Sequence, residues 1–177
     1  FDPNLNTQII ERLKIEHELQ YAIYNNEFIA FYQPKVLYNG KISGMESLIR
    51  WQSPNRGLIL PSDFIPLAEK NGMIESIGNL ILFQSCMQNK KWQDLGYAPL
   101  RMSVNLSPFQ FRQESLIYNI EKIIMDTSLD PKWLELEITE SGLMENDRDS
   151  INKINRLSEM GIAIAIDDFG TGYSSFS

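Results

Sequence analysis

Two adjacent carboxylates, Asp167 and Asp168, end an apolar run at residues 162–166 and stand directly before a glycine-rich stretch. The run alternates isoleucine with alanine, which predicts a buried strand with small residues on one face. Neighbouring carboxylates repel each other and cost stability unless a cation lies between them. A divalent metal ion is the usual partner, so this strand end predicts a metal site.

Three other predicted strands also carry a side chain with a metal-ligating oxygen, namely Glu46, Asn105 and Glu137. Asn105, Glu137 and Asp167 follow one another at intervals of 32 and 30 residues, about one strand–helix–strand unit each. Any one of them alone would be typical of a solvated strand end or a turn cap. Because the carboxyl ends of parallel strands meet at one rim, the repeated register favours a shared site.

The scarcity of other ligand types narrows the metal chemistry. The chain has one histidine, His17, and one cysteine, Cys86, which argues against a tetrahedral zinc site. Oxygen ligands favour Mg²⁺, Mn²⁺ or Ca²⁺. We expect His17 on a helix surface and Cys86 in the core. Arg50, four residues after Glu46, would meet either a phosphate or a neighbouring carboxylate.

The composition is that of an ordinary globular domain. The 177 residues are 43% apolar and 22% charged, enough for one domain with a real core. A net charge of -7 argues against DNA or another general nucleic-acid partner, but not against a small anionic ligand held by metals. No apolar run approaches the roughly 18 residues that span a bilayer, and no signal-peptide pattern opens the chain. Together with the single cysteine, this predicts a cytoplasmic domain, whatever anchor a longer protein has.

The strands follow from alternation and turn signals. Pro34 is expected to stop the first strand, and Asn39-Gly40 predicts a hairpin turn to the second. The predicted strands cover residues 28–33, 42–51, 100–106, 133–139 and 162–166.

The helices fill most of the intervening sequence. Their 3–4 spacing predicts helices at residues 7–25, 62–71, 73–92 and 107–126. Ser107 is a candidate N-cap with Pro108 at the first helical position. A last helix is capped by Asn146 or Asp147, ends at Gly161 and is expected to turn three apolar residues inward: Ile151, Ile154 and Leu157. Because the last three strands alternate with helices, they are predicted to be parallel in an α/β fold, behind an antiparallel first hairpin.

With the elements placed, the stretches around the candidate ligands show a specific resemblance. The chain resembles the EAL domain of bacterial cyclic diguanylate phosphodiesterases from about residue 9 to its end. The resemblance is carried by residues 46–51, 105–107, 137–140 and 167–175, with support from 32–34 and 61–69. The triplet at 46–48 is Glu-Ser-Leu and not Glu-Ala-Leu, a small change that should leave metal binding intact.

The resemblance implies a modified TIM-type (β/α)₈ barrel with an antiparallel first strand, of which this chain covers about the first five strands. Residues 1–8 would be a linker and residues 9–177 the amino-terminal portion of the domain. A two-metal site for Mg²⁺ or Mn²⁺ would be formed by Glu46, Asn105, Glu137 and Asp167, with Asp168 serving the second ion. Three residues would contact the cyclic dinucleotide: Gln33, Leu48 and Arg50.

The resemblance also assigns catalysis and regulation. Glu46, Asp167 and Asp168 would be catalytic, and Glu140 would hold the loop at residues 169–175, which in this family couples dimerisation to metal binding. Because the chain opens at Phe1 and stops within five residues of Gly172, we expect a longer protein. It would add a lysine, a glutamate and a glutamine to the site, and a sensory or GGDEF-type domain upstream.

Three functions stay open at this point. The first is hydrolysis of cyclic di-GMP to the linear dinucleotide pGpG by a metal-dependent, homodimeric signalling enzyme. The second is a receptor that binds cyclic di-GMP without cleaving it. The third is an inactive fragment of the enzyme, because five strands leave a barrel with an open edge.

Overall fold

The computed structural model describes the backbone of residues 3–139 and 147–167, and the side chains of residues 13–139 and 148–166. Asp168, Glu140 and the loop at residues 169–175 therefore lie outside the described residues, as does the side chain of Asp167.

A single sheet organises the described residues. Its strands are β1 (Phe28–Val36), β2 (Ile42–Ser53), β3 (Gly57–Ile59), β4 (Arg101–Leu106), β5 (Leu134–Thr139) and β6 (Ala163–Asp167). The order is β1-β2-β4-β5-β6, and the short β3 pairs with β2. The β1–β2 and β2–β3 pairs are antiparallel, whereas β2–β4, β4–β5 and β5–β6 are parallel. The predicted antiparallel hairpin followed by parallel strands is confirmed.

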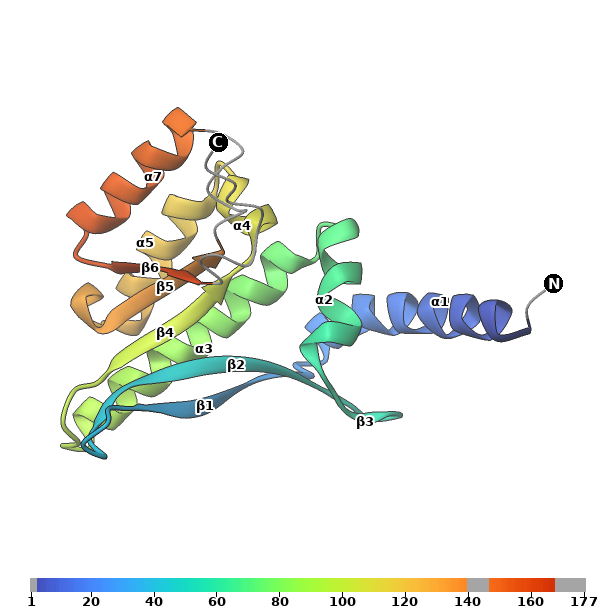
Figure 1. Cartoon of the computed structure of the whole chain (residues 1–177), viewed down its shortest axis with the longest axis horizontal. Helices are drawn as coiled ribbons and strands as arrows, with labels where there is room; N and C mark the ends of the chain where they lie inside the picture. The colour runs from blue at the N-terminus through green and yellow to red at the C-terminus, as the bar shows by residue number, and fades with distance from the viewer. Residues whose placement is uncertain (1–2, 140–146, 168–177) are drawn as a thin grey trace.

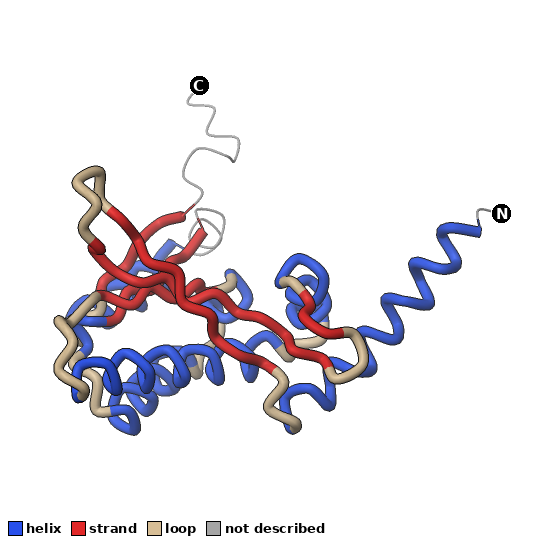
Figure 2. Tube along the Cα trace, turned by 90° about the horizontal axis from the view of Figure 1, so that it is seen from below, coloured by secondary structure: helices blue, strands red, loops and turns tan. Residues whose placement is uncertain are grey.

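The helices lie between these strands in the chain. They are α1 (Pro3–Tyr24), α2 (Pro61–Lys70), α3 (Ile74–Asp94), α4 (Pro108–Arg112), α5 (Leu116–Thr127) and α7 (Asp147–Glu159), with a 3₁₀ turn at Pro131–Trp133. Helices α3, α5 and α7 lie along one side of the sheet, and α1 extends away from it (Figure 1). Figure 2 shows the same separation of helices from strands in a second view. The side chains of the candidate site, described below, lie on the opposite face of the sheet.

The core lies between the sheet and these helices. Each parallel strand turns alternate apolar side chains toward the helices, and Leu134, Leu136 and Ile138 of β5 are all fully buried. At the α2 end of the core, Phe28, Trp51 and Phe64 form an aromatic cluster. Cys86 is also fully buried, which confirms its predicted core position.

Strand β1 continues past Pro34 to Val36, so the prediction that this proline stops the strand was wrong. The reason is that β1 is the outer strand of the described sheet. Ala30, four residues earlier and therefore in the same orientation, donates its N–H to Gln84 of α3 at 3.0 Å instead of to β2. A proline at such an edge position removes no ladder hydrogen bond, so the strand tolerates it.

Other element boundaries also differ from prediction. Residues 107–126 form two helices, because the backbone of Gln113 is extended (ψ 137°) after α4. The predicted N-cap is confirmed, since the Ser107 side chain accepts a hydrogen bond from the backbone N–H of Gln110. The three-residue β3 was missed because it is too short for an alternation pattern. Helix α1 already begins at Pro3, a residue type suited to a first helical turn.

Helix α7 presents a narrower inward face than expected. Leu157 is fully buried and Ile154 packs against the core, but Ile151 is 55% exposed. Its predicted inward position is therefore wrong. Within the described residues, no helix is long and apolar enough to cross a membrane.

Candidate functional site

The sheet face that points away from the helices carries the candidate ligands. Across the parallel strands, Glu46 is level with Ser103, and Asn105 is level with Glu137. The backbone of Asp167 lies opposite Thr139, two residue pairs beyond the Glu137–Ala165 pair toward the carboxyl ends. The predicted convergence of β2, β4, β5 and β6 at one end of the sheet is thus present in the backbone.

Direct contact joins two of these side chains. Asn105 Nδ2 donates a hydrogen bond to Glu46 Oε1 over 3.0 Å. This bond fixes the orientation of the Asn105 amide, because its nitrogen is directed at the carboxylate and its oxygen is turned away from it. Glu46 and Asn105 therefore present oxygens from neighbouring strands at the same place.

Glu137 is bound by Lys35, a cation that was not predicted from the sequence to be part of the site. Lys35 Nζ forms an ion pair with Glu137 Oε1 and also donates to Ser103 Oγ at 2.6 Å and to Glu135 Oε1 at 3.3 Å. Ser103 in turn donates to Glu135 Oε1 at 2.6 Å. Arg101 Nη1 lies 3.6 Å from the other Glu135 oxygen. We call these five residues the Lys35 network.

The electrostatics of the Lys35 network favour the charged form of its members. Burial by itself would lower the pKa of Lys35, but the hydrogen bond and charge of Glu137, together with Glu135, raise it above its ordinary value. Burial by itself would raise the pKa of Glu135, but the Ser103 hydroxyl, Lys35 and Arg101 bring it below its ordinary value. Lys35 and Glu135 therefore face each other as ammonium and carboxylate at neutral pH.

A cavity of about 390 Å³ opens beside the candidate ligands. Its lining includes Asn105 and Glu137 together with Leu48 and Arg50 of β2. Arg50 Nη1 donates to the backbone carbonyl of Ile49 at 2.7 Å. The cavity therefore brings four of the sequence-predicted site residues to one place, two of them expected ligands and two expected substrate contacts.

Gln33 and Phe31 complete this face on β1. Gln33 is exposed and lies opposite Glu46, and Phe31 lies opposite Leu48. The Arg50 guanidinium carbon is 5.7 Å from the centre of the Phe31 ring, a cation–π contact. All of these side chains lie on the sheet face that carries the candidate ligands.

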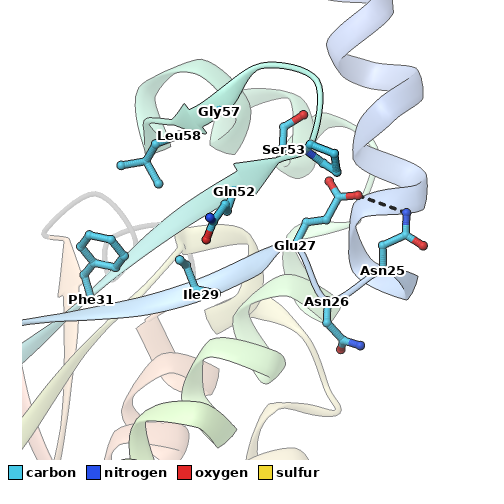
Figure 3. Close-up of a pocket in the computed structure, with 10 residues that line it drawn as sticks. Asn25, Asn26, Glu27, Ile29, Phe31, Gln52, Ser53, Gly57 and Leu58 are labelled. Carbon is cyan, nitrogen blue, oxygen red and sulfur yellow. Dashed lines mark hydrogen bonds between the residues drawn. The ribbon is translucent and has the colours of Figure 1, made fainter.

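A second hollow of about 730 Å³ begins at Phe31. Figure 3 shows Phe31 of β1, Gln52 of β2 and Leu58 of β3 among the residues that line this hollow, with Glu27 hydrogen-bonded to Asn25 at its other end. Glu27 also accepts a hydrogen bond from Trp51 Nε1 at 2.8 Å. The hollow lies at the carboxyl end of β2, between the β2–β3 hairpin and the start of β1.

The donor set suits a hard divalent cation. Glu46, Asn105 and Glu137 offer carboxylate and amide oxygens, the ligands that Mg²⁺ and Mn²⁺ prefer. Among the side chains that the structure describes, no three histidine, cysteine, aspartate or glutamate residues gather closely enough to hold a metal. The other two predicted ligands, Asp167 and Asp168, have side chains outside that set. The described oxygens fit the predicted metals, and no cluster of cysteine or histidine in the described part of the chain offers an alternative site.

Lys35 was not predicted as part of the site, because the first strand was expected to end at Gln33. A signal was present, since a strand that continues past Pro34 places Lys35 on the same face as Gln33. Strand alternation also places Ser103 on the same face as Asn105 and Glu135 on the same face as Glu137, but it does not show the cation that joins them.

Comparison with known proteins identifies the family. The family model described as the EAL domain matches residues 16–177. A bifunctional diguanylate cyclase/cyclic di-GMP phosphodiesterase of Pseudomonas aeruginosa, MucR, is 43% identical over 176 residues, 99% of this chain and 26% of that protein. The Escherichia coli cyclic di-GMP phosphodiesterase PdeR is 37% identical over 177 residues, 100% of this chain and 27% of that protein. The chain thus spans about a quarter of the length of these relatives.

A solved structure agrees with the sequence relatives. The MucR phosphodiesterase of P. aeruginosa in complex with c-di-GMP superimposes with a TM-score of 0.87 and 44% identity, covering 92% of this chain and 66% of that one. The sheet described above is accordingly the first part of a TIM-type barrel with an antiparallel first strand, as predicted. This chain belongs to the EAL domain family.

Proposed function

We propose that this chain forms the first part of the active domain of a bacterial phosphodiesterase that hydrolyses cyclic di-GMP to the linear dinucleotide pGpG with Mg²⁺ or Mn²⁺. The family membership supports the proposal, as do the cyclic di-GMP phosphodiesterase activities for which MucR and PdeR are named. So does the c-di-GMP bound to the structurally similar MucR phosphodiesterase.

One observation carries the proposal for this chain itself. Side chains with metal-ligating oxygens from adjacent parallel strands meet at one sheet face, where Asn105 is hydrogen-bonded to Glu46 and level with Glu137. The cavity beside them is lined by Arg50, a cation suited to a phosphate, and by Leu48. Metal-ligating oxygens beside a cation that could pair with a phosphate are suited to metal-assisted phosphodiester hydrolysis.

The predicted ligands would hold two metal ions. Glu46, Asn105, Glu137 and Asp167 would hold one cation, and Asp168 would serve a second. When bound, the pair would supply a water of lowered pKa and stabilise the charge on the leaving oxygen. The water oxygen bonds to phosphorus, one bond from phosphorus to a ribose oxygen breaks, and that oxygen takes up a proton.

Substrate positioning would come from three residues beside the ligands. Arg50 would pair with a phosphate oxygen, for which its guanidinium must exchange the Ile49 carbonyl that it now contacts. Leu48 would pack against the dinucleotide in the cavity, and the exposed Gln33 amide would donate or accept a hydrogen bond from β1.

The wider assembly is also a proposal. We propose a homodimer in which Glu140 holds the loop at residues 169–175, and a longer chain with a sensory or GGDEF-type domain. The fourfold greater length of MucR and PdeR supports a multidomain protein. A cytoplasmic site of action would give the domain access to an intracellular second messenger.

The test is a hydrolysis assay on the natural full-length protein. Cyclic di-GMP is incubated with the protein and Mg²⁺ or Mn²⁺, and the products are separated by chromatography. We expect the linear dinucleotide from wild type, and little from Glu46→Gln. Glu159→Gln, an exposed carboxylate on α7, is the matched control. Tight binding of cyclic di-GMP without a linear product would identify a receptor and refute the proposed hydrolysis.

A further inference from the structure

We propose that Lys35 is a positioning residue for the metal site: it fixes the carboxylate of Glu137 so that one of its oxygens is presented to the cation. This inference rests on the proposed function, because it assigns Glu137 to the ligand set. Nothing in the resemblance described above gives Lys35 a role.

The contacts of Lys35 define the geometry. Its ammonium bonds Glu137 Oε1, Ser103 Oγ and Glu135 Oε1, so all three of its N–H donors have partners on β4 and β5. The Glu137 side chain is only 10% exposed, and Ser103 is 1% exposed. Because Lys35 takes Oε1, the second oxygen of Glu137 is the one left for a metal ion. A carboxylate tied at one oxygen cannot rotate away from that arrangement without breaking the ion pair.

Strand direction explains how Lys35 approaches. Strand β1 is antiparallel to β2, and Lys35 lies opposite Gly44, which is level with Arg101 on β4. Lys35 therefore begins one side-chain layer below Glu46 and Ser103, on the amino-terminal side of the parallel strands. Its ammonium therefore reaches Glu137 from the amino-terminal side of the parallel strands. The side toward their carboxyl ends, where Asn105 and Glu46 lie, stays open to the metal ion.

The curvature of the sheet makes this contact possible. Strands β2 and β4 separate β1 from β5, which in a flat sheet would be three spacings of about 4.8 Å, roughly 14 Å. Lys35 spans this separation because the sheet curls toward the face that it occupies. Gly44, the residue opposite Lys35 on β2, presents no side chain in its path.

Lys35 also balances the negative charges of two neighbouring carboxylates. Glu135 and Glu137 are two residues apart on one strand face, and their carboxylates repel each other in a partly buried environment. Lys35 pairs with both, and Arg101 pairs with Glu135. Without Lys35, Glu137 would lose its only described cationic partner and would relax toward water or toward Arg101, away from the ligand position.

The experiment measures Mn²⁺ affinity by electron paramagnetic resonance on the natural full-length protein, without substrate. Residues that orient metal ligands typically contribute 10–100-fold in metal affinity, so we expect Lys35→Met to weaken Mn²⁺ binding by about 10–100-fold. Lys35→Arg restores most of the affinity, because a guanidinium also pairs with a carboxylate. Lys90→Met, which removes an exposed ion pair with Asp94 on α3, is the matched control and keeps wild-type affinity.

Two further arms separate positioning from stability. Circular dichroism checks that Lys35→Met is folded, and if it is not, Lys35→Gln is the second variant. Glu135→Gln removes the other carboxylate of the Lys35 network but keeps the Lys35–Glu137 pair, so its Mn²⁺ affinity falls far less than that of Lys35→Met. An equal loss in Glu135→Gln would show a general role in stability and overturn the inference.

The outcomes also separate this inference from the proposed function. A folded Lys35 variant that binds Mn²⁺ as tightly as wild type, or more tightly, refutes the positioning role alone. Wild-type protein that binds Mn²⁺ but yields no linear dinucleotide refutes the proposed hydrolysis and leaves the positioning role standing. Wild-type protein that binds no Mn²⁺ and yields no linear dinucleotide with Mg²⁺ or Mn²⁺ refutes both.

Discussion

Asn89 connects the fold to the candidate site, and its removal should cost more stability than the loss of any surface residue. It lies on α3, 2% exposed, and its Nδ2 donates to the backbone carbonyls of Leu100 at 3.0 Å and Trp133 at 3.2 Å. These carbonyls directly precede β4 and β5, the strands whose opposite ends carry Asn105 and Glu137. Asn89→Ala removes this donor from both carbonyls, at positions that are partly buried.

The size of the effect follows from those two hydrogen bonds. A buried polar group left unsatisfied costs about 1–3 kcal/mol, so two carbonyls cost roughly 2–6 kcal/mol together. Alanine is the better helix former and returns about 0.5 kcal/mol. The net loss is therefore about 1.5–5.5 kcal/mol. In a domain of this size 1 kcal/mol corresponds to about 2–4 °C, so the melting temperature should fall on the order of 10 °C.

Thermal unfolding followed by circular dichroism measures the shift. Asn79→Ala is the matched control, because it makes the same substitution on the same helix at a half-buried position. The control should keep or slightly raise the melting temperature. An Asn89→Ala protein that melts within about 2 °C of wild type would show that the two carbonyls find other donors, and would refute the reasoning.

Three further predictions test the core and the Lys35 network. Burial raises the pKa of Cys86 to about 12. A thiol reagent at pH 8 should therefore label the native protein far more slowly than the urea-unfolded protein. Equal labelling rates would contradict the buried position. The pKa of Glu135 is lowered in the folded state, so its stabilising contribution is present above its unfolded pKa of about 4.3 and lost as the pH falls through the lower folded value. Melting temperatures measured between pH 6 and pH 3 should therefore fall less steeply in Glu135→Gln than in wild type, and parallel curves would count against this assignment. A Cβ at Gly44 would lie 2.9 Å from the backbone oxygen of Arg101. Gly44→Ala should therefore lower the free energy of unfolding, measured in urea, by about 1–3 kcal/mol. An unchanged urea midpoint would mean that β2 and β4 can move apart.

The sequence was sufficient for the order and direction of most strands. Regular spacing between Asn105, Glu137 and Asp167 reflects a repeated strand–helix unit, and such a unit has few ways to fold. The match of Ser107 and Pro108 to a helix start depends on local backbone chemistry alone, which is why it was confirmed.

What could not be predicted depends on tertiary context. Pro34 stays within β1 because that strand has an edge facing α3, and edge position is not a property of local sequence. The contact between Lys35 and Glu137 joins residues 102 positions apart and requires the curl of the sheet. The break at Gln113 likewise follows from packing, since no proline or glycine marks it.

The most direct measurement for the site is an anomalous difference map from crystals of the full-length protein soaked in Mn²⁺. We predict a peak within about 2.5 Å of oxygens from Glu46, Asn105, Glu137 and Asp167, at the carboxyl ends of their strands. A second peak should lie beside Asp168. Mn²⁺ bound elsewhere on the domain, with these oxygens free of it, would contradict the proposed active site.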